Sequence, residues 1–198
     1  MSCLAQHMRT RLVDGRVIAA SATERRVAMR AIFRLAADTQ LLSVSLVDEH
    51  LHLLGCCTRE AGSRLVHAVE VSLKRRLSLP VGFAMYPHEP VRDGRHLRNA
   101  FRYVLTQHSH HGLQTDPLRE GTNLQDILGL RLAGSDTRLH VRRWLPRVSR
   151  AQLLGWLGVA ALEPADGPLE WVHDAALSAA CLATLAGRSR QVRRASGV

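Results

Sequence analysis

The stretch Ser45-Leu-Val-Asp-Glu-His-Leu-His-Leu-Leu54 decides how this sequence folds. It continues an apolar, β-type run that starts at Gln40, is interrupted by Asp48-Glu49 and resumes as His50-Leu-His-Leu-Leu. A polar break between two strand-like runs predicts two antiparallel strands joined by a tight turn near Asp48. Because alternate residues of a strand face the same way, His50 and His52 are expected to project from one face of the sheet.

Amphipathic helices are predicted on both sides of this hairpin. Apolar residues spaced by four predict a helix over 22–37 before it and a helix over 60–78 after it. The second helix ends in Lys74-Arg75-Arg76 ahead of Pro80, and cations interact favourably with this end of a helix. A third helix is predicted over 93–107, with leucine, phenylalanine and valine side chains along one face.

These elements define a fold class. One further strand is expected near 16–20 and another over 81–86, so the order is βαββαβ followed by a helix. This order predicts an α+β protein with a ferredoxin-like βαββαβ core. After residue 130 the composition becomes Arg-rich and helix-forming. We therefore expect two parts, a domain over 1–130 and a small all-helical appendage over 131–198.

The charge narrows the classes of function. The sequence has 27 Lys+Arg against 17 Asp+Glu, a net charge of +10, and Lys74 is its only lysine. Both halves are basic, which indicates a polyanionic partner, either nucleic acid or an anionic membrane. The longest strongly apolar stretch, 175–186, is too short to span a bilayer, and residues 1–10 hold no apolar leader. We expect no membrane insertion and a cytoplasmic, nucleoid-associated protein.

The cysteines give no sign of a disulfide framework. The sequence has four of them without Cys-x-x-Cys spacing: Cys3, Cys56, Cys57 and Cys181. A cysteine zinc site is not expected either, and a reducing compartment fits. We interpret the cysteines as packing residues.

Two pairs of side chains are candidates for chemistry. His50 and His52 form half of a divalent-metal site, although such a pair also arises by chance among 11 histidines. Tyr103 and Gln107 are four residues apart on the predicted 93–107 helix and therefore share one of its sides. A tyrosine at this position could equally pack its ring at the edge of the core with the hydroxyl outward. Tyr86, next to a proline, is interpreted as structural.

Taken together, the two pairs resemble a known constellation. The stretch 45–54 resembles the strand–turn–strand of the single-tyrosine HUH endonucleases, which ends in H-hydrophobic-H-hydrophobic-L. Further along, Phe101-Arg-Tyr-Val-Leu-Thr-Gln107 resembles that family's R-Y-hydrophobic-x-x-N/Q helix. The resemblance covers roughly 22–130 and is to the transposase superfamily, specifically its REP-associated tyrosine transposase branch.

The resemblance implies a site and a reaction. His50, His52 and the Gln107 carbonyl would hold Mg²⁺ or Mn²⁺, and the metal would polarise a scissile phosphate. Tyr103 would attack that phosphate to form a covalent 5′-phosphotyrosine and free a 3′-OH. The implied substrate is single-stranded DNA next to a hairpin, a repetitive extragenic palindrome. With only one tyrosine per chain available at the site, exchange through two linkages would need two chains, and the protein is expected to be a monomer or homodimer.

Two positions depart from the family pattern. The family commonly has a Pro-Asn pair before the first histidine, where this chain has Asp48-Glu49. It often has Asn-Pro at the end of the tyrosine helix, where this chain has Gln107-His108. Glutamine still supplies a carbonyl oxygen, so the ligand set is kept. The first departure leaves open a degenerate, inactive copy of the enzyme.

The arginines are assigned to phosphate binding. The segment 176–190 also resembles part of the DNA-binding helix-turn-helix of the bacterial replication initiator DnaA. The alternative for this segment is an Arg-rich helix end that contacts phosphates without sequence preference. The predicted DNA-binding residues are Arg75, Arg76, Arg102, Arg142, Arg143, Arg188 and Arg190.

Three functions are compatible with these features. The first is a metal-dependent tyrosine endonuclease and strand transferase. The second is a non-catalytic DNA- or RNA-binding protein that keeps the fold of a degenerate transposase. The third is a zinc hydrolase that uses His50 and His52. Tyr103 separates them, because only the first function requires its hydroxyl.

Overall fold

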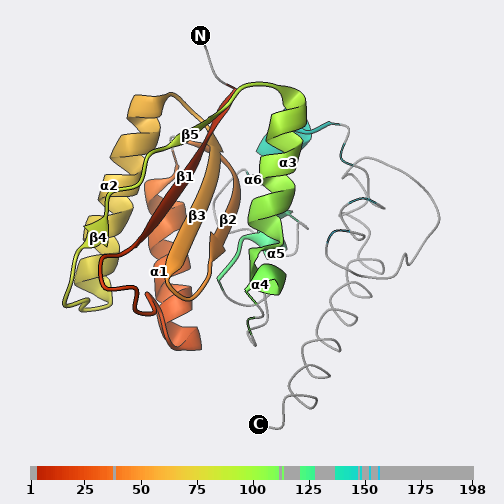
Figure 1. Cartoon of the computed structure of the whole chain (residues 1–198). Coiled ribbons are helices and arrows are strands. Elements are labelled where there is room, and N and C mark those ends of the chain that lie inside the picture. Colours follow the sequence, from red (N-terminus) through yellow and green to blue (C-terminus); the bar gives the residue numbers. More distant parts are fainter. Residues whose placement is uncertain are drawn as a thin grey trace, which may run out of the picture.

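The computed structural model describes residues 4–37, 39–111, 113, 121–127, 137–146, 148, 152 and 156 of the 198-residue chain. The described residues form an antiparallel sheet with helices on both of its faces (Figure 1). The elements in chain order are β1 (Ala5–Leu12), α1 (Ala22–Leu35), β2 (Gln40–Leu46), β3 (His50–Cys56), α2 (Arg59–Arg76), β4 (Phe83–Ala84), β5 (Glu89–Val91), α3 (Gly94–Leu105), α4 (Gln107–His110), α5 (Leu124–Ile127) and α6 (Thr137–Trp144).

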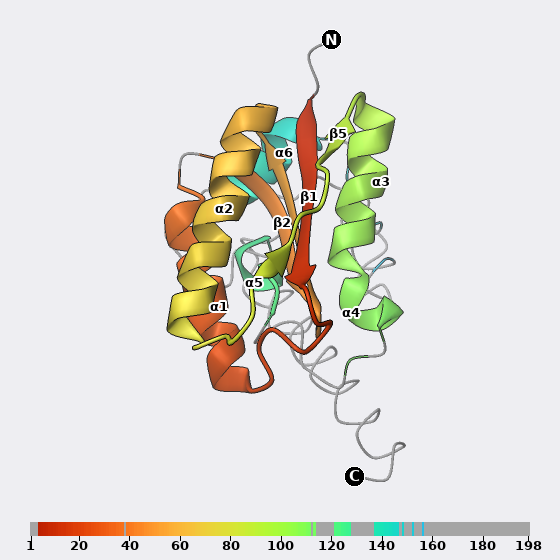
Figure 2. The ribbon, with the colours of Figure 1, turned by 60° about the vertical axis from the view of Figure 1, so that its left-hand side comes forward.

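The sheet has the strand order β2-β3-β1-β4, and neighbouring strands are antiparallel. This is the order of a ferredoxin-like βαββαβ plan, and the predicted α+β class is confirmed. The strand expected over 81–86 is reduced to β4, while β5, which the sequence did not predict, also pairs with β1. Figure 2 shows the sheet between α1 and α2 on one side and α3 on the other.

The first strand lies earlier in the chain than the sequence indicates. A strand is expected near 16–20, but the structure forms it at Ala5–Leu12 and gives residues 16–20 no regular structure. Met8 and Leu12 are buried in the core, whereas the other face of β1 carries polar side chains. A strand with one polar face has a weak hydrophobic signature. Ile18 is buried as a loop residue instead.

One face of the sheet is closed by α1 and α2. Ser21 and Glu24 form a capping box at the start of α1, and Thr58 Oγ1 accepts from the Ala61 N–H at the start of α2. Both helices bury apolar side chains against the sheet, and removing these from water is the main stabilising contribution. From β1 and β3 this core takes Met8, Leu12, Leu51 and Leu53.

The described residues cover the other face of the sheet only in part. α3 packs Leu97, Phe101 and Val104 into an apolar cluster with Ala5 and Leu54 of the sheet. α5 and α6 extend this cluster along β2. Toward the other end of β1 and β3, the same face carries histidine and arginine side chains instead of apolar ones.

Residues 121–123 protect the outer edge of β2. The Leu46 N–H donates to the Gly121 carbonyl at 2.6 Å, and the Val44 N–H donates to Asn123 Oδ1 at 2.8 Å. Gly121 has a φ of +79°, and a Cβ there would lie 2.9 Å from the Leu46 carbonyl oxygen, so this position requires glycine. An edge covered in this way offers no free ladder to another chain.

α6 lies in the segment 131–198 that the sequence predicts as a helical appendage. It packs on β2, and Val141 joins the apolar cluster of α3. Cys56 packs against this cluster, and burial raises the pKa of its thiol to about 12, which fits a packing role. The stretch with the helix-turn-helix resemblance lies outside the described residues. No helix in the part of the chain that the structure describes is long and apolar enough to cross a membrane.

Candidate active site

Histidines from two strands meet on the sheet face next to α3. His7 lies on β1, and His50 and His52 lie on β3, each alternating with residues of the opposite core. The rings of His7 and His52 are stacked with centroids 5.5 Å apart, and the His50 centroid lies 6.1 Å from that of His52. His111, just after α4, adds a ring 6.0 Å from His50. The strand pairing therefore builds a larger histidine cluster than the sequence pattern alone indicates.

Tyr103 approaches this cluster from α3. The helix is capped by Asp93, and its apolar side, with the fully buried Phe101, fixes how it lies on the sheet. This packing places the Tyr103 ring edge-on to both His7 and His52, with 5.7 Å between centroids in each case. Tyr103 is 43 % exposed, so a large molecule can contact this residue.

A series of hydrogen-bonding groups leads from Glu89 through His7 to His52. Glu89 Oε2 lies 3.5 Å from His7 Nδ1, and His7 Nε2 lies 3.2 Å from His52 Nδ1. Because a carboxylate only accepts, His7 carries its proton on Nδ1, and its Nε2 accepts from the His52 Nδ1–H. The lone pair of His52 is then on Nε2, the nitrogen outside the series. This is the state that a metal ligand requires.

The environment of the three strand histidines His7, His50 and His52 favours their neutral form. Burial, followed by the charges of His7, His50 and Arg9, lowers the pKa of His52 to about 3. Burial is also the largest cause of the lowered pKa of His7 and of His50, and nearby carboxylates act in the opposite direction. A neutral imidazole keeps a nitrogen lone pair, so these pKa shifts favour metal binding over ion pairing.

Gln107 begins α4, one turn beyond Tyr103. Its Nε2 donates to the Tyr103 carbonyl oxygen at 3.0 Å. Its Oε1 is buried and has no hydrogen-bond partner among the described residues. A buried carbonyl oxygen without a partner is costly unless a ligand binds it. This oxygen is therefore available to bind a cation.

The donor atoms of the predicted metal ligands are of kinds that divalent cations bind. Within the described ranges, no group of three or more His, Cys, Asp or Glu side chains is arranged to hold a metal ion. His50 and His52 offer two imidazole nitrogens and Gln107 one amide oxygen, so water and substrate oxygens would complete the coordination. The structure brings His50 and His52 together with Tyr103, and it places Gln107 at the start of α4, where its amide nitrogen donates to the Tyr103 carbonyl.

The arginines predicted to bind DNA are not gathered in one place. Arg102 is exposed on α3, next to Tyr103 in the chain. Arg75 and Arg76 end α2, which lies on the opposite face of the sheet (Figure 1).

Two more of these arginines lie on α6. Arg142 and Arg143 are in its last turn, and the Arg143 guanidinium lies 5.5 Å from the centroid of the Trp144 ring. Arg188 and Arg190 lie outside the described residues. Of the predicted arginines that the structure describes, Arg102 is the one beside the tyrosine.

Sequence reasoning missed His7 and Glu89. His7 lies on β1, which was expected further along the chain, near 16–20, and Glu89 lies on β5, which was not expected. The sequence held one signal for β1. Met8 and Leu12 are apolar and share one face of the strand, whereas His7, Arg9 and Arg11 on the other face are polar.

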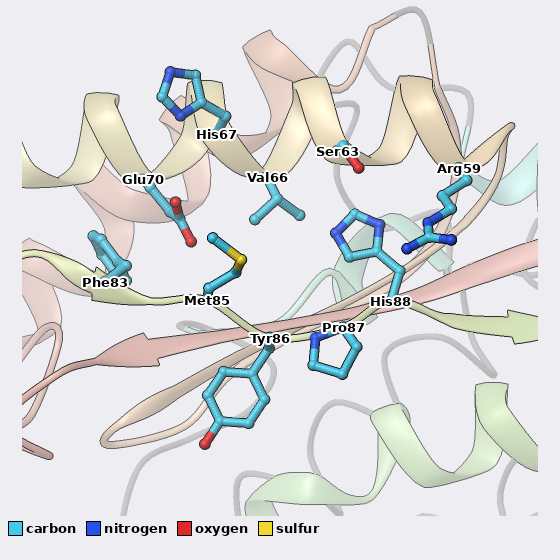
Figure 3. Close-up of a pocket in the computed structure, with 10 residues that line it drawn as sticks. All are labelled: Arg59, Ser63, Val66, His67, Glu70, Phe83, Met85, Tyr86, Pro87 and His88. Atoms are coloured by element: carbon cyan, nitrogen blue, oxygen red, sulfur yellow. The ribbon is translucent and has the colours of Figure 1, made fainter.

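Two hollows of the structure lie away from this cluster. One, of about 610 Å³, opens between α2 and the segment from β4 to His88 (Figure 3). Its lining includes Glu70 of α2 and Met85 of the segment. The other, of about 420 Å³, lies between the start of α3 and the end of α6. The histidine–tyrosine cluster is on a more open sheet face, and such a face suits a polymer better than a small molecule.

Comparison with known proteins gives a likeness of fold. No protein-family model and no curated protein matches the sequence. Among solved structures, the chain is similar to a "REP associates tyrosine transposase bound to a REP hairpin". The TM-score is 0.48 and the sequence identity 14 %, covering 57 % of this chain and 70 % of that chain. A likeness of this extent assigns no activity.

Proposed function

We propose that this protein is a metal-dependent, tyrosine-nucleophile endonuclease and strand transferase acting on single-stranded DNA next to a hairpin. The observation that carries the proposal is the contact of Tyr103 with His7 and His52 at 5.7 Å between ring centroids. An exposed tyrosine beside buried neutral imidazoles is an arrangement that suits nucleophilic attack at a phosphate. The net charge of +10 supports a polyanionic substrate.

In the proposed reaction the Tyr103 hydroxyl oxygen attacks the scissile phosphorus in line with the leaving group. An O–P bond to the tyrosine forms, and the bond from phosphorus to the 3′ oxygen breaks. The 5′ side of the DNA stays on Tyr103, and the other fragment leaves with a 3′-OH. The tyrosine releases one proton and the 3′ oxygen takes up one, so the step balances. One phosphodiester replaces another, so the reverse attack can rejoin strands without ATP.

His50, His52 and Gln107 would hold the Mg²⁺ or Mn²⁺ of this reaction. A bound divalent ion neutralises charge that develops on the phosphate oxygens. The series from Glu89 through His7 keeps His52 in the required tautomer and orientation. Two nitrogen donors bind Mn²⁺ more strongly than Mg²⁺.

The substrate and the assembly are part of the same proposal. The solved structure similar to this chain is described as bound to a REP hairpin, so a REP hairpin with a single-stranded tail is the first substrate to test. Cleavage needs one chain, whereas strand exchange through two tyrosine linkages needs a homodimer. The proposed location is the nucleoid, in the cytoplasm.

The test is a covalent-adduct assay with tailed hairpin oligonucleotides and Mn²⁺. We expect the wild type to form a protein–DNA adduct that survives denaturant, and Tyr103→Phe to bind the DNA without forming it. Tyr86→Phe is the matched control and should keep the adduct.

Other outcomes assign other functions. Binding by the wild type without any adduct would assign the non-catalytic DNA-binding function. Cleavage that persists in Tyr103→Phe would assign a hydrolase that uses His50 and His52.

A further inference from the structure

Two arginines of β1 continue the row of side chains that begins with His7. Arg9 and Arg11 share its face of the strand, and Arg9 pairs with His52 and Arg11 with His50 across β3. The rise of an antiparallel strand puts the two arginines about 7 Å apart along the sheet. The row therefore starts where Tyr103 contacts His7 and runs along the open part of the sheet face.

Tyr86 supports both guanidinium groups of this row. The Cζ atoms of Arg9 and Arg11 lie 5.8 and 5.4 Å from the centroid of the Tyr86 ring. Figure 3 shows that Tyr86 points away from α2, whereas Met85 and His88 point toward it. A cation–π contact orients a guanidinium while leaving its charge and its N–H donors available. The ring therefore organises the arginines without neutralising them.

The charge of the two guanidiniums is not balanced locally. Neither Arg9 nor Arg11 forms an ion pair with a carboxylate of the described residues, and the buried Nε of Arg11 has no hydrogen-bond partner among them. Glu49 and Glu89 lie against histidines instead. Two half-buried, oriented and unpaired guanidiniums favour an anionic ligand.

We infer that Arg9, Arg11 and Tyr86 form a subsite for the phosphodiester backbone of the DNA strand next to the phosphate that Tyr103 attacks. Guanidinium forks bind phosphate oxygens in pairs, and two forks along a β-strand can hold neighbouring phosphates of an extended single strand. The identity of the polymer and the position of the attacked phosphate rest on the proposed function. Tyr86, interpreted from the sequence as structural, here orients the two binding groups.

The test measures binding in the Tyr103→Phe background with a chelator, so that neither covalent chemistry nor metal contributes. The probe is a fluorescent 12-nucleotide oligo(dT), and the dissociation constant is measured by anisotropy over a range of salt concentrations. Replacing both Arg9 and Arg11 by Ala should reduce the slope of log K against log salt by about 1.4, which corresponds to two single-strand phosphate contacts. The matched control replaces Arg30 and Arg34, two exposed arginines of α1 on the other sheet face, and should leave the slope unchanged.

Conservative variants test the geometry of the subsite. Replacing Arg9 and Arg11 by Lys keeps the charge, so the slope should stay while the affinity falls. Tyr86→Leu should weaken binding about two- to fivefold without changing the slope, and Tyr86→Phe should bind like the parent. Circular dichroism of each variant checks that it is folded, and the Lys variant tests the subsite if the Ala variant does not fold.

The inference is overturned if the Arg9/Arg11 variant and the Arg30/Arg34 control have equal slopes. It is also overturned if the Arg9/Arg11 variant loses as much affinity for a blunt hairpin without a single-stranded tail as for oligo(dT). A slope change without an adduct in the wild type would remove the proposed catalysis and leave the subsite in a DNA-binding protein. An adduct without a slope change would leave the catalysis and remove the subsite.

Discussion

The strands β1 and β3 present two chemically different faces. Toward α1 and α2, their side chains are almost fully buried and mostly apolar, as Met8 and Leu53 illustrate, with Thr10 as a polar exception. Toward α3, the intervening positions hold the histidines and arginines of the candidate site. One register thus specifies both a hydrophobic core and a row of functional groups, because alternate residues of a strand point to opposite faces.

The apolar face holds the polar site in place. The helices α1 and α2 bury the apolar face, and this burial stabilises strands whose second face contributes less. α3 covers only the half of that second face where Ala5 and Leu54 lie, and its border carries Tyr103. A site on rigid strands, supported from behind by a packed core, holds its groups in fixed positions.

Variants of two β3 residues on opposite faces are expected to give the largest difference between the apolar and the polar face. Leu53→Ala, on the buried face, should lower the free energy of unfolding by about 2–5 kcal/mol, because it removes packed methyl groups and leaves a cavity. It should leave the Mn²⁺ affinity of the folded protein unchanged. His50→Ala should change the free energy of unfolding by less than about 1 kcal/mol and lower the Mn²⁺ affinity at least about tenfold. Urea denaturation and electron paramagnetic resonance of free Mn²⁺ measure the two quantities. Equal effects of both variants on both quantities would contradict the division.

His7 tests the support within the polar face. His7→Phe keeps a ring against His52 but removes the nitrogen that accepts from it. We expect the Mn²⁺ affinity to fall about 10–100-fold, the usual effect of losing a group that orients a metal ligand. The matched control is His67→Phe, an exposed position of α2 on the other side of the sheet. An unchanged affinity in His7→Phe would show that His52 is oriented without this contact.

The two faces should also differ, by a smaller amount, in how the free energy of unfolding depends on pH. His52 has a pKa of about 3 in the folded chain and about 6.5 when unfolded, so between these values the unfolded chain binds a proton that the folded chain does not. Stability should therefore fall with falling pH in this window, by about 1.4 kcal/mol per pH unit from this residue.

Matched variants isolate this contribution. In a chelator, His52→Asn should have a correspondingly shallower pH dependence than the wild type. Leu53→Ala should lower the free energy of unfolding at every pH without changing its slope against pH. If the free energy of unfolding of His52→Asn and of the wild type had the same pH dependence, burial would not lower the pKa of His52.

The sequence was sufficient where a whole helix face or strand pair is apolar. The helix predicted over 22–37 is Ala22–Leu35, and the helix predicted over 60–78 is Arg59–Arg76. The hairpin over 40–57 was also predicted, because both of its strands carry dense apolar side chains. These elements have a local signature that follows from what they bury.

The rest of the site depends on pairing between distant strands. His7 contacts His52 across 45 residues of sequence, and nothing in the local pattern of β1 indicates that it pairs with β3. Glu89 reaches His7 through β5, a three-residue strand too short to have a recognisable pattern. The residues predicted from the resemblance lie within its sequence motifs. His7 and Glu89, which position His52, lie on strands that carry no motif. The metal ligation of Gln107 and the role of Tyr103 stay predictions.

Identifying the amino acid that becomes linked to DNA tests the proposed role of Tyr103 directly. The wild-type protein is incubated with Mn²⁺ and a tailed hairpin, the adduct is digested with protease and nuclease, and the modified peptide is sequenced by mass spectrometry. We expect a nucleotide joined through its 5′ phosphate to Tyr103, at the border between the covered and the open half of the sheet face. A nucleotide on Tyr86, or cleaved DNA with no nucleotide on either tyrosine, would contradict this role.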